Sequence, residues 1–102
     1  VALATDFNPG TSPTVSLPLV MTLGVSQLRL SASEAVTAAT LNGAAALGLS
    51  GQVGAIAPNY SPDLALFDIR DYRELPYWLG ARVCSRLWTR GKACGVHDLD
   101  VI

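Results

Sequence analysis

The chain has few of the residues from which stabilising crosslinks and metal sites are usually built. Its 102 residues include two cysteines and one histidine, His97. Two cysteines are too few for a disulfide framework, so we expect two reduced structural thiols in a cytoplasmic protein. If Cys84 and Cys94 flank a hairpin that turns near Arg90-Gly91, they are out of register with each other. We expect His97 to be an exposed residue of the tail rather than a metal ligand.

Strong net charge and long apolar runs are also missing. The net charge is −1 and the isoelectric point is near 5.6, so nothing electrostatic favours a nucleic acid or an anionic membrane as partner. No uninterrupted apolar run reaches the roughly 18 residues of a transmembrane helix. The sequence therefore predicts a protein that binds neither nucleic acid nor membrane.

Charged residues are scarce in the first part of the chain. Residues 1–62 carry only Asp6, Arg29 and Glu34, whereas the other twelve charged residues follow position 62. One interpretation is an alanine-rich helical core. The other, which we favour, is a segment that the rest of a larger protein normally covers, because so little polar surface is present.

The first half of the chain, 1–49, reads as one strand followed by helices. Val1–Thr5 is apolar on both faces, as a buried parallel strand is. Asn8-Pro9-Gly10-Thr11 has the composition of a type II turn, with glycine at the position that needs a positive φ. Three helices are expected next: Leu17 to Leu28 with Ser16 as N-cap, a second opened by the capping box Ser31–Glu34, and Leu41 to Leu47, closing at Gly48.

The second half, 50–102, reads as β-rich. Large apolar residues predict a strand over Asp63–Ile69, and Arg70–Glu74 reads as a polar loop. Val83–Thr89 alternates as a strand does, and Lys92–Val96 is the candidate return strand after the turn at Arg90-Gly91.

Asp6 is the candidate catalytic residue. It follows the predicted strand directly, and α/β enzymes place their chemistry at such strand ends. A carboxylate there can bind a metal, take a proton from the metal's water and carry it to a leaving nitrogen. Alone, an Asp before a turn more often caps that turn by accepting from the amide two residues on.

The neighbours of Asp6 strengthen the catalytic interpretation. Asn8 offers an amide that donates and accepts, Gly10 allows close approach of a substrate to the backbone, and Thr11 adds a hydroxyl. Such a polar cluster suits a carboxylate or an amide, although proline and glycine are also ordinary turn residues.

These motifs carry a resemblance to a known family. The run from Val1 to Pro13, containing Asp-Phe-Asn-Pro-Gly, resembles the C-terminal part of the imidazolonepropionases, metal-dependent amidohydrolases of histidine degradation. The likeness covers about the first eighty residues. It continues through Ser16–Met21, Arg29–Ala35, Ala46–Leu49, Asp63–Asp68 and Glu74–Tyr77.

The resemblance implies an α/β fold: the C-terminal portion of a (β/α)8 barrel plus strands of a small composite β-sandwich domain. It implies hydrolysis of the ring amide of 4-imidazolone-5-propanoate to N-formimidoyl-L-glutamate. By matching positions, Asp6 would bind zinc or iron, Asn8 and Gly10 would contact the product, and Thr11 would contact the substrate. The other metal ligands and the substrate-binding arginines of the family lie upstream, so the missing N-terminal part of the same protein is an expected partner, and a homodimer is a further option.

The sequence also departs from the family. Residues 56–62 lack the family's Gly-Lys-type turn, and residues 94–102 match nothing in it. A barrel of this kind needs about 250 residues, so we expect the isolated chain to be inactive. Two alternatives stay open: another cyclic amidohydrolase or deaminase of the superfamily, and a non-catalytic domain that binds a protein partner.

Overall fold

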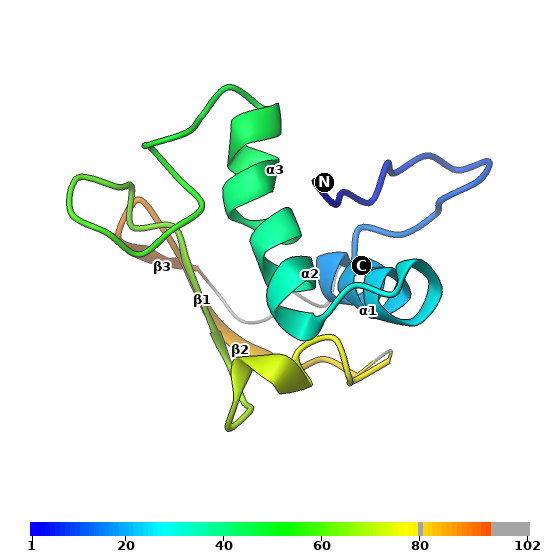
Figure 1. Cartoon of the computed structure of the whole chain (residues 1–102). Coiled ribbons are helices and arrows are strands. Elements are labelled where there is room, and N and C mark those ends of the chain that lie inside the picture. Colours follow the sequence, from blue (N-terminus) through cyan, green and yellow to red (C-terminus); the bar gives the residue numbers. More distant parts are fainter. Residues whose placement is uncertain (80, 95–102) are drawn as a thin grey trace.

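The chain combines three helices with a small antiparallel sheet. The computed structural model describes residues 1–79 and 81–94. Figure 1 shows α2 and α3 between the sheet on one side and the N-terminal segment on the other. The elements in chain order are α1 (Leu17–Leu28), α2 (Ala32–Ala39), α3 (Leu41–Ala46), β1 (Leu64–Phe67), the 3-10 helix η1 (Tyr72–Glu74), β2 (Cys84–Thr89) and β3 (Lys92–Cys94).

Helix α1 begins where the sequence predicts. The Ser16 hydroxyl accepts a hydrogen bond from the Leu19 amide at 3.3 Å, and Pro18 occupies the first turn, where its missing N–H leaves no bond unmade. The helix ends at Arg29, which has a φ of 58°, while the Leu30 amide donates to the Gly24 carbonyl at 3.2 Å. None of the helices in the described part of the chain has the length and hydrophobicity needed to cross a membrane.

The next two helix termini are also the predicted ones. In α2 the Glu34 amide donates to the Ser31 hydroxyl at 3.1 Å, and the Ser31 amide donates to the Glu34 carboxylate at 2.9 Å. This capping box lowers the pKa of Glu34, chiefly through the Ser31 amide. Helix α3 closes at Gly48, whose φ of 73° lets the following amide, that of Leu49, donate to the Ala44 carbonyl at 2.8 Å.

The sheet confirms the predicted hairpin. Its strand order is β1-β2-β3, and both pairs are antiparallel. Arg90 and Gly91 link β2 to β3 with φ values of 52° and 80°, as a tight hairpin turn requires. The strands predicted over Asp63–Ile69 and Val83–Thr89 are shorter in the structure, where they span Leu64–Phe67 and Cys84–Thr89. The expected extension of the last strand to Val96, the tail residue His97 and the rest of 95–102 lie outside the described residues.

The two cysteines are out of register, as predicted. Cys84 lies opposite Phe67, and Cys94 lies opposite Leu87. Both thiols are free and partly buried. Burial raises the pKa of Cys84, which keeps the thiol protonated and unreactive near neutral pH.

The strand predicted over Val1–Thr5 is not found, because these residues belong to no sheet of the described chain. The segment packs against the helices instead. The Leu3 amide donates to the Ala38 carbonyl at 3.0 Å, and the Asn42 side chain donates to the Val1 carbonyl at 2.7 Å. A strand forms only when a neighbouring strand supplies the ladder, and none of the described residues lies there to do so.

The core is small and is shared between the helices and the second half of the chain. Met21, Ala35 and Leu75 form its buried centre, with Leu3, Phe67, Val83 and other partly buried side chains packed around them. Ala38 and Ala44 are also buried. Because three of these five side chains are alanines, the core removes little apolar surface from water.

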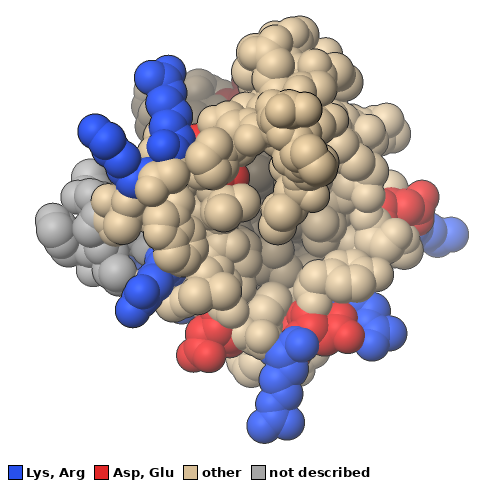
Figure 2. All heavy atoms as spheres, turned by 90° about the vertical axis from the view of Figure 1, so that its left-hand side faces the viewer, with Lys and Arg blue, Asp and Glu red and all other residues tan. Residues whose placement is uncertain are grey.

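Much of the apolar surface stays exposed. Ile56 is 91% exposed, Leu47 76% and Leu79 67%. Figure 2 shows the face that carries the sheet, where charged side chains lie at the periphery around a broad uncharged area with a hollow in it. This distribution agrees with the interpretation that another part of a larger protein covers the segment.

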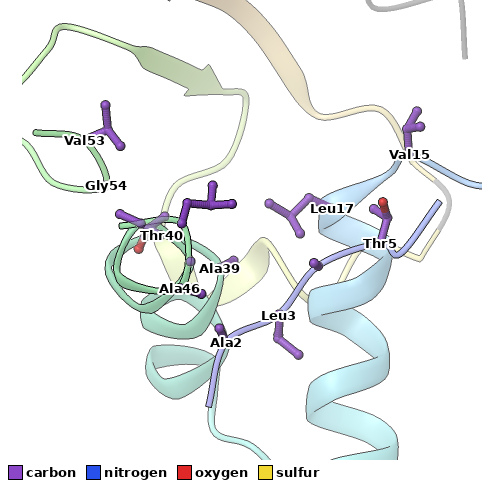
Figure 3. Close-up of a pocket in the computed structure, with 14 residues that line it drawn as sticks. Ala2, Leu3, Thr5, Val15, Leu17, Ala39, Thr40, Ala46, Val53 and Gly54 are labelled. Atoms are coloured by element: carbon purple, nitrogen blue, oxygen red, sulfur yellow. The ribbon is translucent and has the colours of Figure 1, made fainter. Parts of the chain in front are cut away.

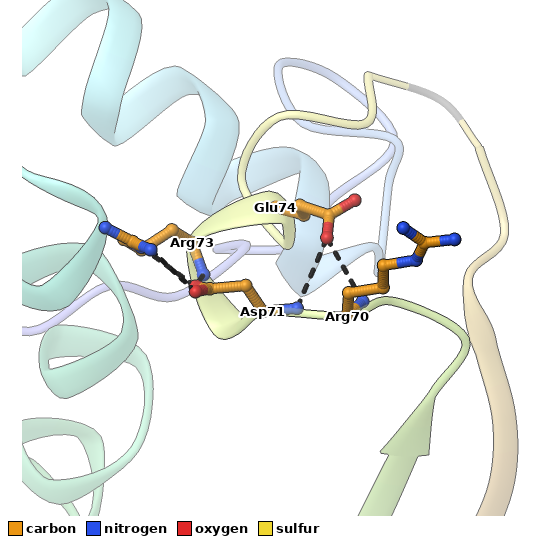
Figure 4. Close-up of polar contacts among 4 residues, drawn as sticks. All are labelled: Arg70, Asp71, Arg73 and Glu74. Carbon is orange, nitrogen blue, oxygen red and sulfur yellow. Dashed lines mark hydrogen bonds and ion pairs between the residues drawn. The ribbon is translucent and has the colours of Figure 1, made fainter.

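The connection after β1 is more ordered than the predicted polar loop. It contains η1, which begins at Asp71 (Figure 4). The Glu74 carboxylate accepts from the amides of Arg70 and Asp71 at 3.1 and 3.2 Å. The Asp71 carboxylate accepts from Arg73 Nε at 2.9 Å and Nη2 at 2.7 Å. Charged side chains of the predicted polar loop therefore cap a turn that leads into the buried Leu75.

This cap has a measurable pH signature. Hydrogen bonds from the Arg73 side chain and amide lower the pKa of Asp71 from 3.8 to about 2. Since the folded pKa is the lower one, the stabilisation is complete above the unfolded value of 3.8 and disappears as pH falls toward 2. A carboxyl-carbon NMR titration should find Asp71 ionising near 2, and Arg73→Ala should raise that pKa toward 3.8. An unchanged titration in Arg73→Ala would contradict the assignment.

Candidate functional site

The loop that follows Thr5 places Asp6 in an unusual backbone conformation. Asp6 has a φ of 49°, a left-handed conformation that Asp and Asn adopt more readily than most other residues. Its side chain is exposed, and none of the described residues donates a hydrogen bond to the carboxylate. The turn-capping role considered for Asp6 is therefore not the one observed. Both oxygens are free to accept a ligand.

Asn8 performs the capping instead. Its side-chain oxygen accepts from the Gly10 amide at 2.9 Å and from the Thr11 amide at 2.8 Å. Its side-chain nitrogen donates to the Asp6 carbonyl and to the Thr11 hydroxyl, both at 3.0 Å. One amide side chain thus organises the whole loop, as Asn residues do in turns.

The turn at Gly10 differs from the predicted type II turn. Gly10 is not among the residues with positive φ, which type II requires at this position. The Asn8 side chain, by accepting from two successive amides, determines the turn in place of the glycine conformation. Space still matters at Gly10, because a Cβ there would lie 3.3 Å from the Asn8 side-chain oxygen.

Ser12 closes the loop. Its amide and carbonyl pair with the carbonyl and amide of Asn8 at 3.2 and 3.0 Å. Its hydroxyl donates to the Thr5 carbonyl at 2.6 Å. Sequence reasoning did not single out this residue, because a serine next to a proline in a turn carries no spacing signal.

The structure therefore brings three of the four candidate site residues together. Asn8, Gly10 and Thr11 form one hydrogen-bonded unit, while the Asp6 carboxylate lies free at its start. The exposed Thr11 hydroxyl stays bonded to Asn8, which fixes its direction. The loop thus carries a carboxylate with no described hydrogen-bond donor at Asp6 and an oriented hydroxyl at Thr11.

An open groove of about 570 Å³ borders the start and the end of this loop. Figure 3 shows Leu3 and Thr5 on one side of it and Ala39 and Thr40 on another. Thr5 and Thr40 supply the only side-chain hydroxyls among its lining residues, and no charged residue lines it. A groove of this composition suits an apolar packing partner rather than a charged substrate or a metal.

The described residues offer a metal one candidate ligand and do not form a complete metal site. Residues 1–79 and 81–94 contain no group of three His, Cys, Asp or Glu side chains that could hold a metal ion. A catalytic zinc ordinarily takes about three protein ligands. Asp6, exposed and without a hydrogen-bond donor among the described residues, is chemically suited to be one such ligand.

Comparison with known proteins relates this chain to one protein family and to relatives that share one name. The family described as Amidohydrolase family matches residues 1–94. An imidazolonepropionase of Solibacter usitatus is 40% identical over 90% of this chain, and one of Geobacillus thermodenitrificans is 46% identical over 90%. One of Rubrobacter xylanophilus is 51% identical over 78%. These alignments cover 22%, 22% and 19% of the relatives, so the chain spans about a fifth of their length.

Proposed function

Because this chain belongs to the amidohydrolase family, which matches residues 1–94, we propose that it is part of an imidazolonepropionase. That enzyme hydrolyses the ring amide of 4-imidazolone-5-propanoate to N-formimidoyl-L-glutamate in histidine degradation. Support comes from relatives of that name at 40 to 51% identity. The observation that carries the proposal is the loop in which Asn8 and Ser12 bind the two carbonyls that flank Asp6, while Asn8 also orients the Thr11 hydroxyl.

Asp6 has two roles in this proposal. Its carboxylate holds a zinc or iron ion as one of several ligands. The bound metal makes water a usable nucleophile near neutral pH. Asp6 takes the proton of the attacking water and passes it to the ring nitrogen as the C–N bond breaks, which makes the nitrogen a better leaving group. The exposed, unpartnered carboxylate is suited to both steps.

The other loop residues bind the organic part of the substrate. Thr11 contacts the imidazolone ring, and its hydroxyl is already oriented by Asn8 at 3.0 Å. Asn8 and Gly10 contact the open-chain product. The absence of a side chain at Gly10 leaves the Asn8 oxygen uncrowded, since a Cβ would lie 3.3 Å from it.

We propose that an upstream part of the same polypeptide completes the site. In this arrangement residues 1–49 contribute the last strand and helices of a (β/α)8 barrel, and residues 50–102 contribute to a small β-sandwich domain. Three features support the proposal: the single available ligand, the apolar groove beside Thr5, and the length of the relatives. A homodimer is a second way to cover the exposed apolar surface. The two free thiols favour the cytoplasm.

A product assay on the complete protein tests the proposal. Incubation with 4-imidazolone-5-propanoate and zinc should yield N-formimidoyl-L-glutamate, identified by its mass, and a chelator should stop its formation. The family also leaves open a deaminase or another cyclic amidohydrolase. Release of ammonia from a purine or pyrimidine, with no formimidoyl-glutamate from the imidazolone, would overturn the assignment.

A further inference from the structure

Among the described residues, only the backbone positions the Asp6 side chain. No described residue holds either carboxylate oxygen, so the Cα and the two flanking peptide groups set the direction of the Cα–Cβ bond and with it the region that the carboxylate can reach. The φ of 49° is a left-handed conformation that is less stable than an ordinary one, so contacts around it must maintain it.

Both peptide groups that flank Asp6 are held by side chains of the same loop. The carbonyl before Asp6, that of Thr5, accepts from the Ser12 hydroxyl at 2.6 Å. The carbonyl after it, that of Asp6 itself, accepts from the Asn8 side chain at 3.0 Å. Ser12 and Asn8 are themselves joined by two backbone hydrogen bonds. Rotation of either peptide group would therefore break its hydrogen bond to Ser12 or to Asn8, and these two residues are held together by their own backbone hydrogen bonds.

The Ser12 contact is the one that reaches farthest along the chain. It spans seven residues and is partly buried, whereas the contacts of Asn8 span two or three residues and are exposed. Water competes less well with a partly buried bond. The Ser12 hydroxyl is thus the main link between the end of the loop and the peptide that precedes Asp6.

We infer that Ser12 is a positioning residue, whose hydroxyl holds the Thr5–Asp6 peptide so that the Asp6 carboxylate points toward the metal. The inference rests on the proposed function, in which Asp6 is a metal ligand. Residues that orient metal ligands typically change metal affinity or activity by about 10- to 100-fold when they are removed. Ser12 contacts neither metal nor substrate in this assignment and acts through Asp6.

The test compares Ser12→Ala with Ser12→Thr in the complete protein. Ser26→Ala, on the exposed side of α1, is the matched control. Titration of the metal-free protein with Zn²⁺ should show about 10- to 100-fold weaker binding for Ser12→Ala and wild-type binding for the other two variants. In Ser12→Ala kcat should fall by a similar factor while KM changes little, since the substrate-binding groups remain. The metal-free variant should unfold within about 4 °C of the wild type.

Two results would overturn the inference. One is Ser12→Ala with wild-type zinc affinity. The other is metal-free Ser12→Ala that unfolds far below the wild type while Ser12→Thr restores neither stability nor zinc binding, because that pattern marks a purely structural role. If the complete protein binds zinc but yields no formimidoyl-glutamate, the proposed function fails, and the zinc titration still decides the role of Ser12.

Discussion

Asp6→Asn in the complete protein should lower kcat for imidazolone hydrolysis by about 10³-fold or more and leave the purified protein with substoichiometric zinc. The change removes the proton carrier, a role worth roughly 10² to 10⁴ in rate, and also one negatively charged ligand. Asn is the cleanest replacement because it is nearly the same size and tolerates the left-handed backbone at this position. Steady-state kinetics and metal analysis on the same preparation measure both effects.

Asp68→Asn is the matched control for this prediction. Asp68 is an exposed acid just after β1, and its contact with the sheet is made by its backbone amide, which donates to the Val83 carbonyl at 2.7 Å. The substitution therefore changes charge by the same amount and should leave kcat and zinc content unaltered. Full turnover by Asp6→Asn with a normal zinc content would show that this carboxylate is not the ligand.

The isolated 102-residue chain should hydrolyse no imidazolone and should associate through its apolar surface. Residues 1–79 and 81–94 contain no group of three side chains that could hold a metal, and Asp6 alone cannot retain a catalytic zinc. Apolar side chains lie exposed on its surface, such as Ile56 at 91% and Val1 at 83%. Their burial between copies favours association over the monomer. We expect strong fluorescence of a dye that binds apolar surface and a light-scattering mass that rises with concentration.

The complete protein under identical conditions is the reference for that experiment. It should show weak dye fluorescence and a mass independent of concentration, because the apolar groove beside Thr5 is then covered. Sustained zinc-dependent turnover by a monodisperse preparation of residues 1–102 would contradict both the incomplete site and the proposed barrel.

Local signals in the sequence predicted the helices and the hairpin well. The caps at Ser16 and Ser31 depend on side chains within three residues of the amides they bind, so the information lies next to the element that it specifies. The turn at Arg90-Gly91 and the out-of-register cysteines follow from the same kind of short-range pattern.

Two sequence predictions were wrong because the hydrogen-bond partners of a segment cannot be read from its composition. The strand expected over Val1–Thr5 needs a neighbouring strand, and the described chain contains none beside it. The type II turn at Gly10 was wrong because composition does not reveal which side chain will bind the turn amides, and here Asn8 binds two of them. The roles assigned to Asp6 and Thr11 stay predictions, since they rest on the proposed function.

The left-handed backbone at Asp6 also restricts which acid can serve there. Glutamate offers an equivalent carboxylate, yet it occupies this left-handed conformation less readily than aspartate or asparagine. Exchanging one acid for the other would therefore work against the backbone conformation of the loop. Chain geometry thus favours aspartate at position 6 before any coordination preference comes into play.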